Sequence, residues 1–273
     1  MTPPTAPSSP PLTWDAESLW LALEPLAPGL SIDIVPEIGS TSTALLERGR
    51  RGLTEPALMV AESQTAGRGR LGRPWWSQPG QALMFSLGLR LAPADWSGLS
   101  LAGGLAPAEA LDERGGLEWP NDLWLRGDDR KLAGILIEVA PLAEPARPGE
   151  RWVVIGAGLN VTPLPPGAAD AATTFRTGYA CLQELDPTLT APRALHRVAA
   201  PLLRAVLDFE TRGLAPLRDR SARRDVLAGR RVQAGEVVVG TAAGLSDDGS
   251  LLVRDDDGRL HPVHSGEVSV RPC

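Results

Sequence analysis

The chain has 273 residues, of which 43% are hydrophobic and 22% are charged, a composition typical of a globular protein with a sizeable core. Its formal net charge of −6 argues against a protein that binds nucleic acid mainly by neutralising phosphates, since such a protein is expected to be basic. No apolar run is long enough to span a bilayer, the first residues lack the pattern of a signal peptide, and two cysteines cannot build a disulfide framework. We therefore predict a cytoplasmic protein that does not cross a membrane.

The first part of the chain predicts helices that alternate with strands after an irregular tail. Residues 1–12 contain five prolines and little that packs, so we expect them to be disordered. Apolar periodicity and capping residues then predict, in chain order, a helix over 14–28, a strand over 31–38, a helix that begins near 44, strands over 58–62 and 82–91, and a helix over 99–114.

The middle of the chain predicts a group of strands and one long helix. The strands are expected over 117–119, 123–125, 131–139 and 152–161, with a turn over 126–130. Apolar residues with a helical period then extend from Leu195 to Phe209, and Pro201 lies inside this predicted helix.

The character of the sequence changes near Gly229. Between Arg231 and Arg271, four or five short strands are separated by turns that contain glycine, which is typical of a small β-barrel. We therefore predict a mixed α+β domain over 13–228, followed by a small all-β domain over 229–273.

Two residue types are unusually rare in this chain. Lys131 is the only lysine among 27 basic residues, and asparagine occurs only at Asn121 and Asn160. Our hypothesis is that codon bias has replaced both types wherever another polar residue serves. A compact ammonium and a planar guanidinium differ physically, so these three positions are interpreted as places where replacement fails. The alternative is chance survival at a solvated surface.

A loop rich in glycine and arginine lies between two of the predicted strands. It reads GRGRLGR over residues 67–73, and its three glycines let the backbone approach a ligand. Its three arginines concentrate positive charge in an otherwise acidic chain, which suits a polyphosphate. The alternatives are a solvated basic loop and an RNA-binding Arg–Gly tract. A P-loop is excluded, because the only lysine lies outside the required G-x-x-x-x-G-K-[ST] context.

Two further segments carry residues suited to chemistry. WPNDLWL over 119–125 and RKLAGILIE over 130–138 are joined by a turn, so a hairpin would bring Asp122 and Lys131 to one end of the sheet. There the lysine either forms an ordinary ion pair or stabilises negative charge that grows at a phosphoryl centre. The strand IGAGLNV over 155–161 lacks the third glycine and the following helix of a dinucleotide-binding fingerprint. We interpret it as a pocket wall that leaves room for a flat ligand.

The combination of GRGRLGR, WPNDLWL with RKLAGILIE, and IGAGLNV resembles the biotin protein ligases, which are biotin–[acetyl-CoA-carboxylase] ligases. The resemblance runs from about residue 31 to the end, with the motifs in the same order. It implies an α+β fold: a mixed β-sheet flanked by helices, as in a class II synthetase-like catalytic domain, over 13–228, and an SH3-like barrel over 229–273. The bifunctional branch adds an N-terminal winged helix that represses biotin genes. This chain leaves no room for that domain and resembles the monofunctional branch.

The resemblance also implies roles for individual residues. A Ser-Thr-Asn segment that holds the biotin ureido ring corresponds here to Ser40, Thr41 and Ser42, with Ser42 in place of the asparagine. The other implied biotin contacts are Gln64, Gly67, Arg68, Gly69, Arg70, Trp75, Lys131, Gly134, Leu136, Gly156 and Ala157. The implied nucleotide contacts are Arg68, Arg70, Asn121, Asp122, Lys131, Asn160, Glu267 and Arg271. The predicted catalytic residues are Lys131, Arg68, Arg70 and Asp122, and no residue is assigned to a resident metal.

The implied reaction is an ATP-dependent ligation in two steps, with biotin and ATP as substrates and Mg²⁺ as cofactor. The biotin carboxylate attacks the α-phosphorus of ATP, and a lysine of a biotin carboxyl carrier protein domain then takes up the biotinyl group. Two unit charges of like sign repel by about 4 kcal/mol at 4 Å and an effective dielectric constant of 20, which explains a local cluster of cations. We expect no contact with DNA or a membrane, and the resemblance allows a homodimer.

Two other functions stay open. A lipoate-type acyl ligase shares the catalytic fold and would activate lipoate instead of biotin. A nucleic-acid-binding module with an Arg–Gly loop and a β-barrel would show salt-sensitive retention on DNA or RNA, which we expect to be absent. The three histidines, His196, His261 and His264, are scattered and lack a cysteine partner, so we expect packing or surface roles rather than a metal site.

Overall fold

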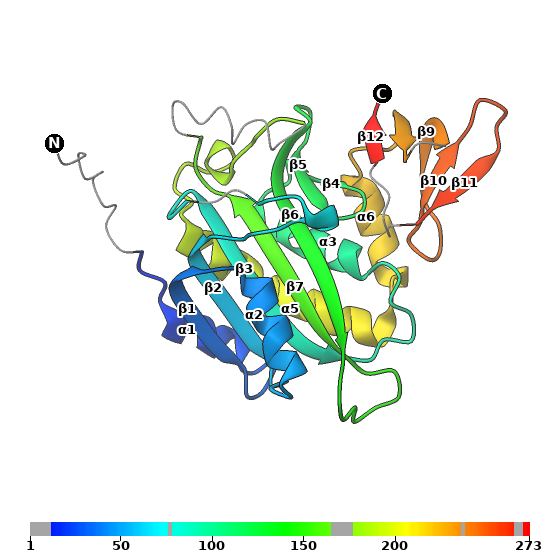
Figure 1. The fold of residues 1–273 in the computed structure, drawn as a ribbon. Helices are drawn as coiled ribbons and strands as arrows, with labels where there is room; N and C mark the ends of the chain where they lie inside the picture. The colour runs from blue at the N-terminus through cyan, green and yellow to red at the C-terminus, as the bar shows by residue number, and fades with distance from the viewer. Residues whose placement is uncertain (1–11, 76–77, 165–176, 236–237, 265–269) are drawn as a thin grey trace.

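The structure is a computed structural model that describes residues 12–75, 78–164, 177–235, 238–264 and 270–273. Within this part the chain forms two sheets, with helices packed on the larger one (Figure 1). Residues 1–11, which make up nearly all of the predicted tail, lie outside the described residues. Among the described helices, none combines the length and the apolar character that a bilayer span requires.

The larger sheet has seven strands in the order β1-β2-β3-β7-β6-β5-β4. The strands are β1 (Ser31–Ile38), β2 (Ala57–Gln64), β3 (Ala82–Leu91), β4 (Gly115–Glu118), β5 (Asp122–Leu125), β6 (Arg130–Pro141) and β7 (Arg151–Asn160). β1 and β2 run parallel and the other neighbouring pairs are antiparallel, so the predicted mixed sheet is confirmed.

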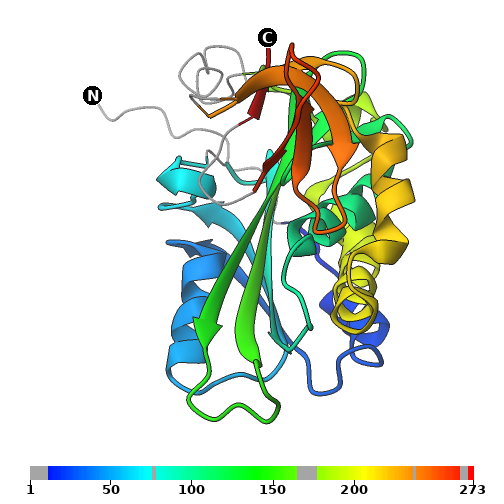
Figure 2. The same cartoon turned by 90° about the vertical axis from the view of Figure 1, so that its right-hand side faces the viewer.

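Helices cover both faces of this sheet (Figure 2). They are α1 (Ala16–Leu23), α2 (Thr41–Arg50), α3 (Leu99–Leu111), α5 (Ala191–Arg212) and α6 (Arg218–Arg224), with the short 3-10 turns η1 (Arg70–Gly72), η2 (Leu182–Glu184) and η3 (Ala215–Leu217). α2 packs on one face against β3 and β7, whereas α3 and α5 pack on the other face and against each other.

The alternation of side chains along the strands creates an apolar core on each face. Along β7, Val153 and Ile155 join the core formed with α3 and α5. Trp152 and Val154 point the other way and pack with Leu45 of α2. The predicted apolar stripe of α5 is buried, and its members are Leu195, Val198, Leu202, Val206 and Phe209.

Two helices are shorter than predicted, and one helix was not predicted. α1 ends at Leu23 rather than at residue 28, because Pro25 and Pro28 follow and proline disrupts a helix interior. α3 ends at Leu111 rather than at residue 114. The sequence of α6, RDRSARR, has no apolar stripe and was not predicted to be helical.

The smaller sheet is antiparallel and has five strands in the order β11-β10-β9-β8-β12. The strands are β8 (Arg231–Ala234), β9 (Val238–Leu245), β10 (Leu251–Arg254), β11 (Leu260–Val263) and β12 (Val270–Pro272). Its inward-facing residues include Val232, Ala242 and Val253, which are 0–2% exposed. This is the small all-β unit predicted from the glycine-containing turns, and it is consistent with the SH3-like domain that the resemblance implies.

The smaller sheet packs against the end of the larger sheet that carries β4. The indole Nε1 of Trp119 donates to the carbonyl oxygen of Gly249 at 3.0 Å, across the junction. Leu214 packs so closely over Gly98 and Gly249 that an added Cβ would lie 2.8 and 2.9 Å from it. β12 lies beside the functional site, because Val270 and Pro272 line its cavity.

Candidate functional site

A cavity of about 410 Å³ opens on the face of the larger sheet that carries α2, beneath the Arg–Gly loop. A cavity of this size is typical of a small-molecule site. The predicted site residues that line it are Ser40, Thr41, Ser42, Gln64, Arg68, Gly69, Arg70, Trp75, Asn121, Asp122, Lys131, Gly134, Leu136, Gly156 and Ala157. Residues from distant parts of the sequence therefore meet at one place.

The floor of the cavity is made of glycines in the middle of the sheet. Gly134 of β6 is paired with Gly158 of β7, and Gly156 lies two residues before Gly158 on the same face. A Cβ at Gly156 would lie 2.4 Å from Ser42 Oγ, and one at Gly158 would lie 2.4 Å from the Trp75 ring. The absence of side chains is therefore what leaves room for a ligand, as the IGAGLNV motif predicts.

Hydroxyl and amide groups form a network at the end of the cavity next to α2. The backbone N–H of Thr41 donates to Gln64 Oε1 at 2.8 Å, and Thr41 Oγ1 lies 2.7 Å from Ser86 Oγ. Ser42 Oγ lies 3.0 Å from the same Ser86 oxygen. Because Ser40 caps α2, the first helical turn holds these hydroxyl groups in place, where they are buried. This end of the cavity suits a polar, uncharged ring.

The Arg–Gly loop folds back on itself as a small hairpin above the cavity. The backbone N–H of Gly69 donates to the Arg73 carbonyl at 2.7 Å, and that of Trp75 donates to the Gly67 carbonyl at 2.9 Å. Gly67 itself lies at the base of the loop and does not line the cavity in the described residues. The hairpin thus presents the arginines and Trp75 to the cavity.

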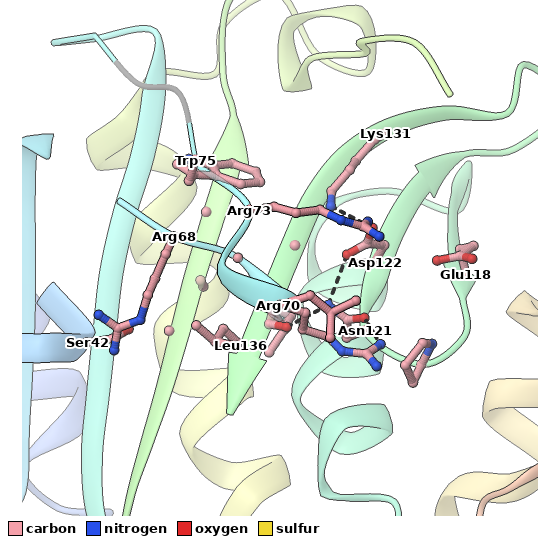
Figure 3. A pocket seen from close by; sticks show the side chains of 18 of the residues that line it. Ser42, Arg68, Arg70, Arg73, Trp75, Glu118, Asn121, Asp122, Lys131 and Leu136 are labelled. Atoms are coloured by element: carbon pink, nitrogen blue, oxygen red, sulfur yellow. Dashed lines mark hydrogen bonds and ion pairs between the residues drawn. The ribbon is translucent and has the colours of Figure 1, made fainter. Parts of the chain in front are cut away.

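Arg68 connects this loop to α2 and β6. Its guanidinium donates to both carboxylate oxygens of Glu138, at 2.8 and 3.0 Å, and also contacts Thr43 Oγ1. Figure 3 shows Arg68 on the Ser42 side of the cavity, well apart from Lys131. In this arrangement Arg68 anchors the loop, whereas the resemblance implies a contact with substrates.

Lys131 points into the cavity, where its ammonium forms an ion pair. Its Nζ lies 2.6 Å from Asp122 Oδ2 and 5.6 Å from the centre of the Trp75 ring. The lysine side chain is 21% exposed, so the ammonium reaches the cavity without facing open solvent. β5 and β6 form the hairpin that brings the two residues together, as predicted (Figure 3).

Arg70 and Asn121 extend this ion pair into a longer polar chain. Arg70 Nη1 donates to Asn121 Oδ1 at 2.9 Å, and Asn121 Nδ2 donates to Asp122 Oδ1 at 3.1 Å. Burial lowers the pKa of Arg70, although the negative charges of Asp122 and Glu118 oppose this effect. Two cationic side chains are thus held at the middle of the cavity.

Glu118 is a cavity residue that the sequence does not predict. It lies on β4 directly opposite Asp122 and is only 7% exposed. Burial raises the pKa of Glu118 well above its usual value, and Asp122 adds to this effect, while Lys131 and Arg70 oppose it. A signal was present in the sequence, because a three-residue turn between residues 118 and 122 places their side chains on the same face.

Other residues of the site are also absent from the prediction. Gly158 lies inside the IGAGLNV motif. Ser86 of β3 is paired with Gly156 of β7, so it lies on the same face of the sheet as Gly156 and Gly158. Glu138 is the last residue of the quoted RKLAGILIE segment. Period-two alternation would have found the first two, whereas only the folded loop reveals Arg68 as the partner of Glu138.

One predicted nucleotide contact, Asn160, does not line the cavity. Asn160 is 1% exposed, and its Nδ2 donates to the carbonyls of Lys131 and Ala180 at 2.9 and 3.0 Å. It therefore fixes the backbone of Lys131. The backbone of Arg271 belongs to β12, and Glu267 lies outside the described residues.

The histidines occupy separate places in the fold. His196 contacts the Trp14 carbonyl at 2.9 Å, and His261 pairs with Asp255 at 2.6 Å. Within the described ranges, no group of three or more His, Cys, Asp or Glu residues is arranged to hold a metal ion.

The two halves of the cavity differ in their chemistry. The end near α2 offers neutral donors and acceptors, whereas the middle offers the cations Lys131 and Arg70. A ligand with a polar ring and an acidic chain could therefore place its acid next to these cations. Cations in a partly buried site stabilise such charge more strongly than in water, so a second anion can approach the first.

Comparisons with known proteins agree with this geometry. Residues 35–160 match the model of the Biotin/lipoate A/B protein ligase family, and residues 229–271 match the Biotin protein ligase C terminal domain. The bifunctional ligase/repressor BirA of Escherichia coli is 36% identical over 253 residues, which cover 89% of this chain and 75% of that protein. The biotin–[acetyl-CoA-carboxylase] ligase of Mycobacterium tuberculosis is 35% identical over 256 residues, with 87% and 88% coverage.

A solved structure supports the same relationship. The biotin protein ligase from Aquifex aeolicus in complex with biotin and ATP aligns with a TM-score of 0.71 at 27% identity. The alignment covers 89% of this chain and 99% of that one. The two sheets, the order of the motifs and the matched relatives all indicate the same family. The chain therefore belongs to the biotin protein ligase family.

Proposed function

We propose that this protein is a biotin–[acetyl-CoA-carboxylase] ligase, which activates biotin as biotinyl-5′-AMP and transfers it to a lysine of a biotin carboxyl carrier protein domain. The observation that carries this proposal is the position of Lys131. Its ammonium is held 2.6 Å from Asp122 in a cavity whose other end is a neutral hydroxyl network. Such a cavity can hold the ring of biotin at one end and its carboxylate at the other.

In the first step, a biotin carboxylate oxygen attacks the α-phosphorus of ATP and the bond to the β-phosphate breaks. Pyrophosphate leaves, and a mixed anhydride remains. Lys131 and Arg70 bind the two anions and reduce their mutual repulsion, while Asp122 holds the ammonium in position. Arg68 acts on the same step by anchoring the loop to Glu138.

In the second step, the amine of the acceptor lysine attacks the acyl carbon of the anhydride. An amide forms, the nitrogen loses a proton, and AMP leaves with the bonding electron pair. The loop over residues 67–75 covers the cavity and limits the access of water to the anhydride. No covalent link to the enzyme is needed in either step.

The donor set of the cavity fits Mg²⁺. Magnesium ions accept carboxylate oxygens and are usually held by one or two of them together with substrate phosphates. The carboxylates that line the cavity are those of Glu118 and Asp122, near Arg70. When bound with the nucleotide, Mg²⁺ neutralises charge on the phosphates.

The choice between biotin and lipoate can be measured directly. We expect pyrophosphate release from ATP with biotin and not with lipoate, because the Mycobacterium tuberculosis relative is named a biotin–[acetyl-CoA-carboxylase] ligase and the Aquifex aeolicus structure contains biotin and ATP. With a carrier domain present, intact-mass spectrometry should show the addition of one biotinyl group. A carrier whose acceptor lysine is changed to arginine should stay unmodified. Release with lipoate alone would reject the biotin assignment.

A change in the cavity floor tests where the ring binds. Gly156→Ala places a Cβ 2.4 Å from Ser42 Oγ, so either the hydroxyl network shifts or the ring loses space. Overpacking of this kind typically costs about 1–3 kcal/mol, so we expect biotin to bind about tenfold more weakly or worse. Calorimetry measures this affinity. Gly39→Ala is the matched control, because an added Cβ there meets nothing within 4 Å, and it should bind biotin normally. Normal binding by both variants would contradict the proposed ring position.

The proposal also includes the domain boundaries, the cellular location and the oligomeric state of the enzyme. It places the catalytic domain over 13–228 and the SH3-like domain over 229–273, in a cytoplasmic protein that does not bind DNA. The family match to residues 229–271 supports the second limit. A homodimeric state is the remaining part of the proposal, and light scattering on the purified protein tests it.

A further inference from the structure

Glu118 is a carboxylate of the cavity that the mechanism above does not use. It lies at the end of β4 directly opposite Asp122 on β5, and residues opposite each other in antiparallel strands project from the same face. Glu118 is 7% exposed and lines the cavity. In Figure 3 it lies beyond Asp122 as seen from Lys131.

The surroundings of Glu118 lack the partners that a buried carboxylate needs. Asp122 accepts from Lys131 at 2.6 Å and from Asn121 at 3.1 Å. The Glu118 side chain accepts no hydrogen bond from the part of the chain that the structure describes. A buried carboxylate without a donor is unfavourable, and a second carboxylate opposite makes it more so. A cation that contacts both carboxylates would relieve both effects.

The position of the pair relative to the substrates narrows the choice of cation. Arg70 and Lys131, which the proposed function assigns to the phosphate and carboxylate groups, are both close enough to act electrostatically on Glu118. Two carboxylates at that place would repel a triphosphate unless a cation lies between them. Magnesium is the ion whose usual ligands are one or two carboxylates and substrate phosphates.

We propose that Glu118 and Asp122 together bind the Mg²⁺ that accompanies ATP. The inference rests on the proposed function, since the nucleotide phosphates complete the set of ligands. No group of three or more protein ligands exists among the described residues, so the ion is expected to bind with the nucleotide rather than before it. Glu118 is therefore the residue whose removal should change the magnesium dependence of nucleotide binding.

Calorimetry with α,β-methylene-ATP tests this inference without turnover. In the native protein, with biotin present, we expect Mg²⁺ to strengthen binding of the analogue. In Glu118→Gln, the increase in affinity that Mg²⁺ produces should be smaller by at least about tenfold. Losing a group that supports a metal ion typically weakens metal binding by this much. Without Mg²⁺, the same variant should bind the analogue at least as tightly as the native protein, because one negative charge is gone.

Two further variants serve as controls. Asp225→Asn removes another acid that acts electrostatically on Glu118 but does not line the cavity, and it should keep the full magnesium-dependent gain. Glu118→Asp keeps the carboxylate on a shorter stem and should retain more of the gain than Glu118→Gln. Thermal unfolding shows whether each variant is folded. If Glu118→Gln does not fold, the magnesium dependence of Glu118→Asp tests the proposal instead.

The outcomes are distinct. If Glu118→Gln binds the ATP analogue more weakly by the same factor with and without Mg²⁺, Glu118 has a structural role. If Mg²⁺ strengthens binding to the variant as much as to the native protein, Glu118 does not hold the metal. Either result overturns the proposal. Failure of the proposed function would appear elsewhere, as a native protein that releases no pyrophosphate with biotin and ATP.

Discussion

Replacing Lys131 with alanine should reduce biotinyl-AMP formation by at least about 10²–10³-fold, because a positioned group that stabilises transition-state charge contributes that much. The ammonium is the partner of Asp122 at 2.6 Å and lies 5.6 Å from the Trp75 ring centre. Its removal takes one positive charge from the place where two anions meet and leaves Asp122 without its ion pair. Biotin-dependent pyrophosphate exchange measures the loss.

The neighbouring Arg130 provides a control for Lys131. It pairs with Asp128 and Glu184 outside the cavity, so Arg130→Ala removes a cation from the same strand without touching the site. This variant should keep adenylate formation within about twofold, since exposed ion pairs contribute only about 0–1 kcal/mol. Lys131→Ala should also unfold at nearly the native temperature. Full activity of Lys131→Ala would reject the role assigned to the lysine.

Replacing Trp152 with alanine should lower the free energy of unfolding by about 3–5 kcal/mol, the usual cost of removing a buried aromatic side chain. Trp152 is 0% exposed, and its Nε1 donates to the Leu45 carbonyl of α2 at 2.8 Å. The indole fits against Gly49 and Gly88, where an added Cβ would lie 2.2 and 2.5 Å from it. Deletion therefore leaves a cavity that these neighbours cannot fill.

Thermal and denaturant unfolding measure this effect, and the expected fall in Tm is roughly 6–20 °C. Trp20 is the matched control, because it also donates to a backbone carbonyl but is 42% exposed. Trp20→Ala should cost clearly less than Trp152→Ala. Similar losses for the two variants would contradict the view that Trp152 is the centre of the core beneath α2.

Local patterns in the sequence were enough for much of the site. The hairpin that joins Asp122 to Lys131 spans only nine residues, so a turn signal and two strand patterns were sufficient to bring them together. The glycines at 156 and 158 belong to one strand, and their shared face follows from period-two alternation. The rare residue types also pointed to the site: Lys131 and Asn121 line the cavity, and Asn160 holds the Lys131 carbonyl.

Partners that are distant in the chain could not be obtained in this way. Arg68 and Glu138 are 70 residues apart, and their ion pair attaches the loop to β6. Trp119 donates to Gly249, 130 residues away, and joins the two sheets. Neither contact leaves a periodic signal, because each depends on how whole elements dock.

The amino-acid sequence by itself determined the order of the elements, the division into a mixed α+β part and a small all-β part, and the motifs that identify the family. These follow from periodicity, turn chemistry and spacing, which act over a few neighbouring residues. Tertiary structure alone decided that Arg68 serves as an anchor, that Asn160 supports the lysine strand, and that Glu118 is buried opposite Asp122 without a donor. The reason is physical: burial and charge pairing depend on which surfaces meet, and that is settled only when the strands and the loop pack together.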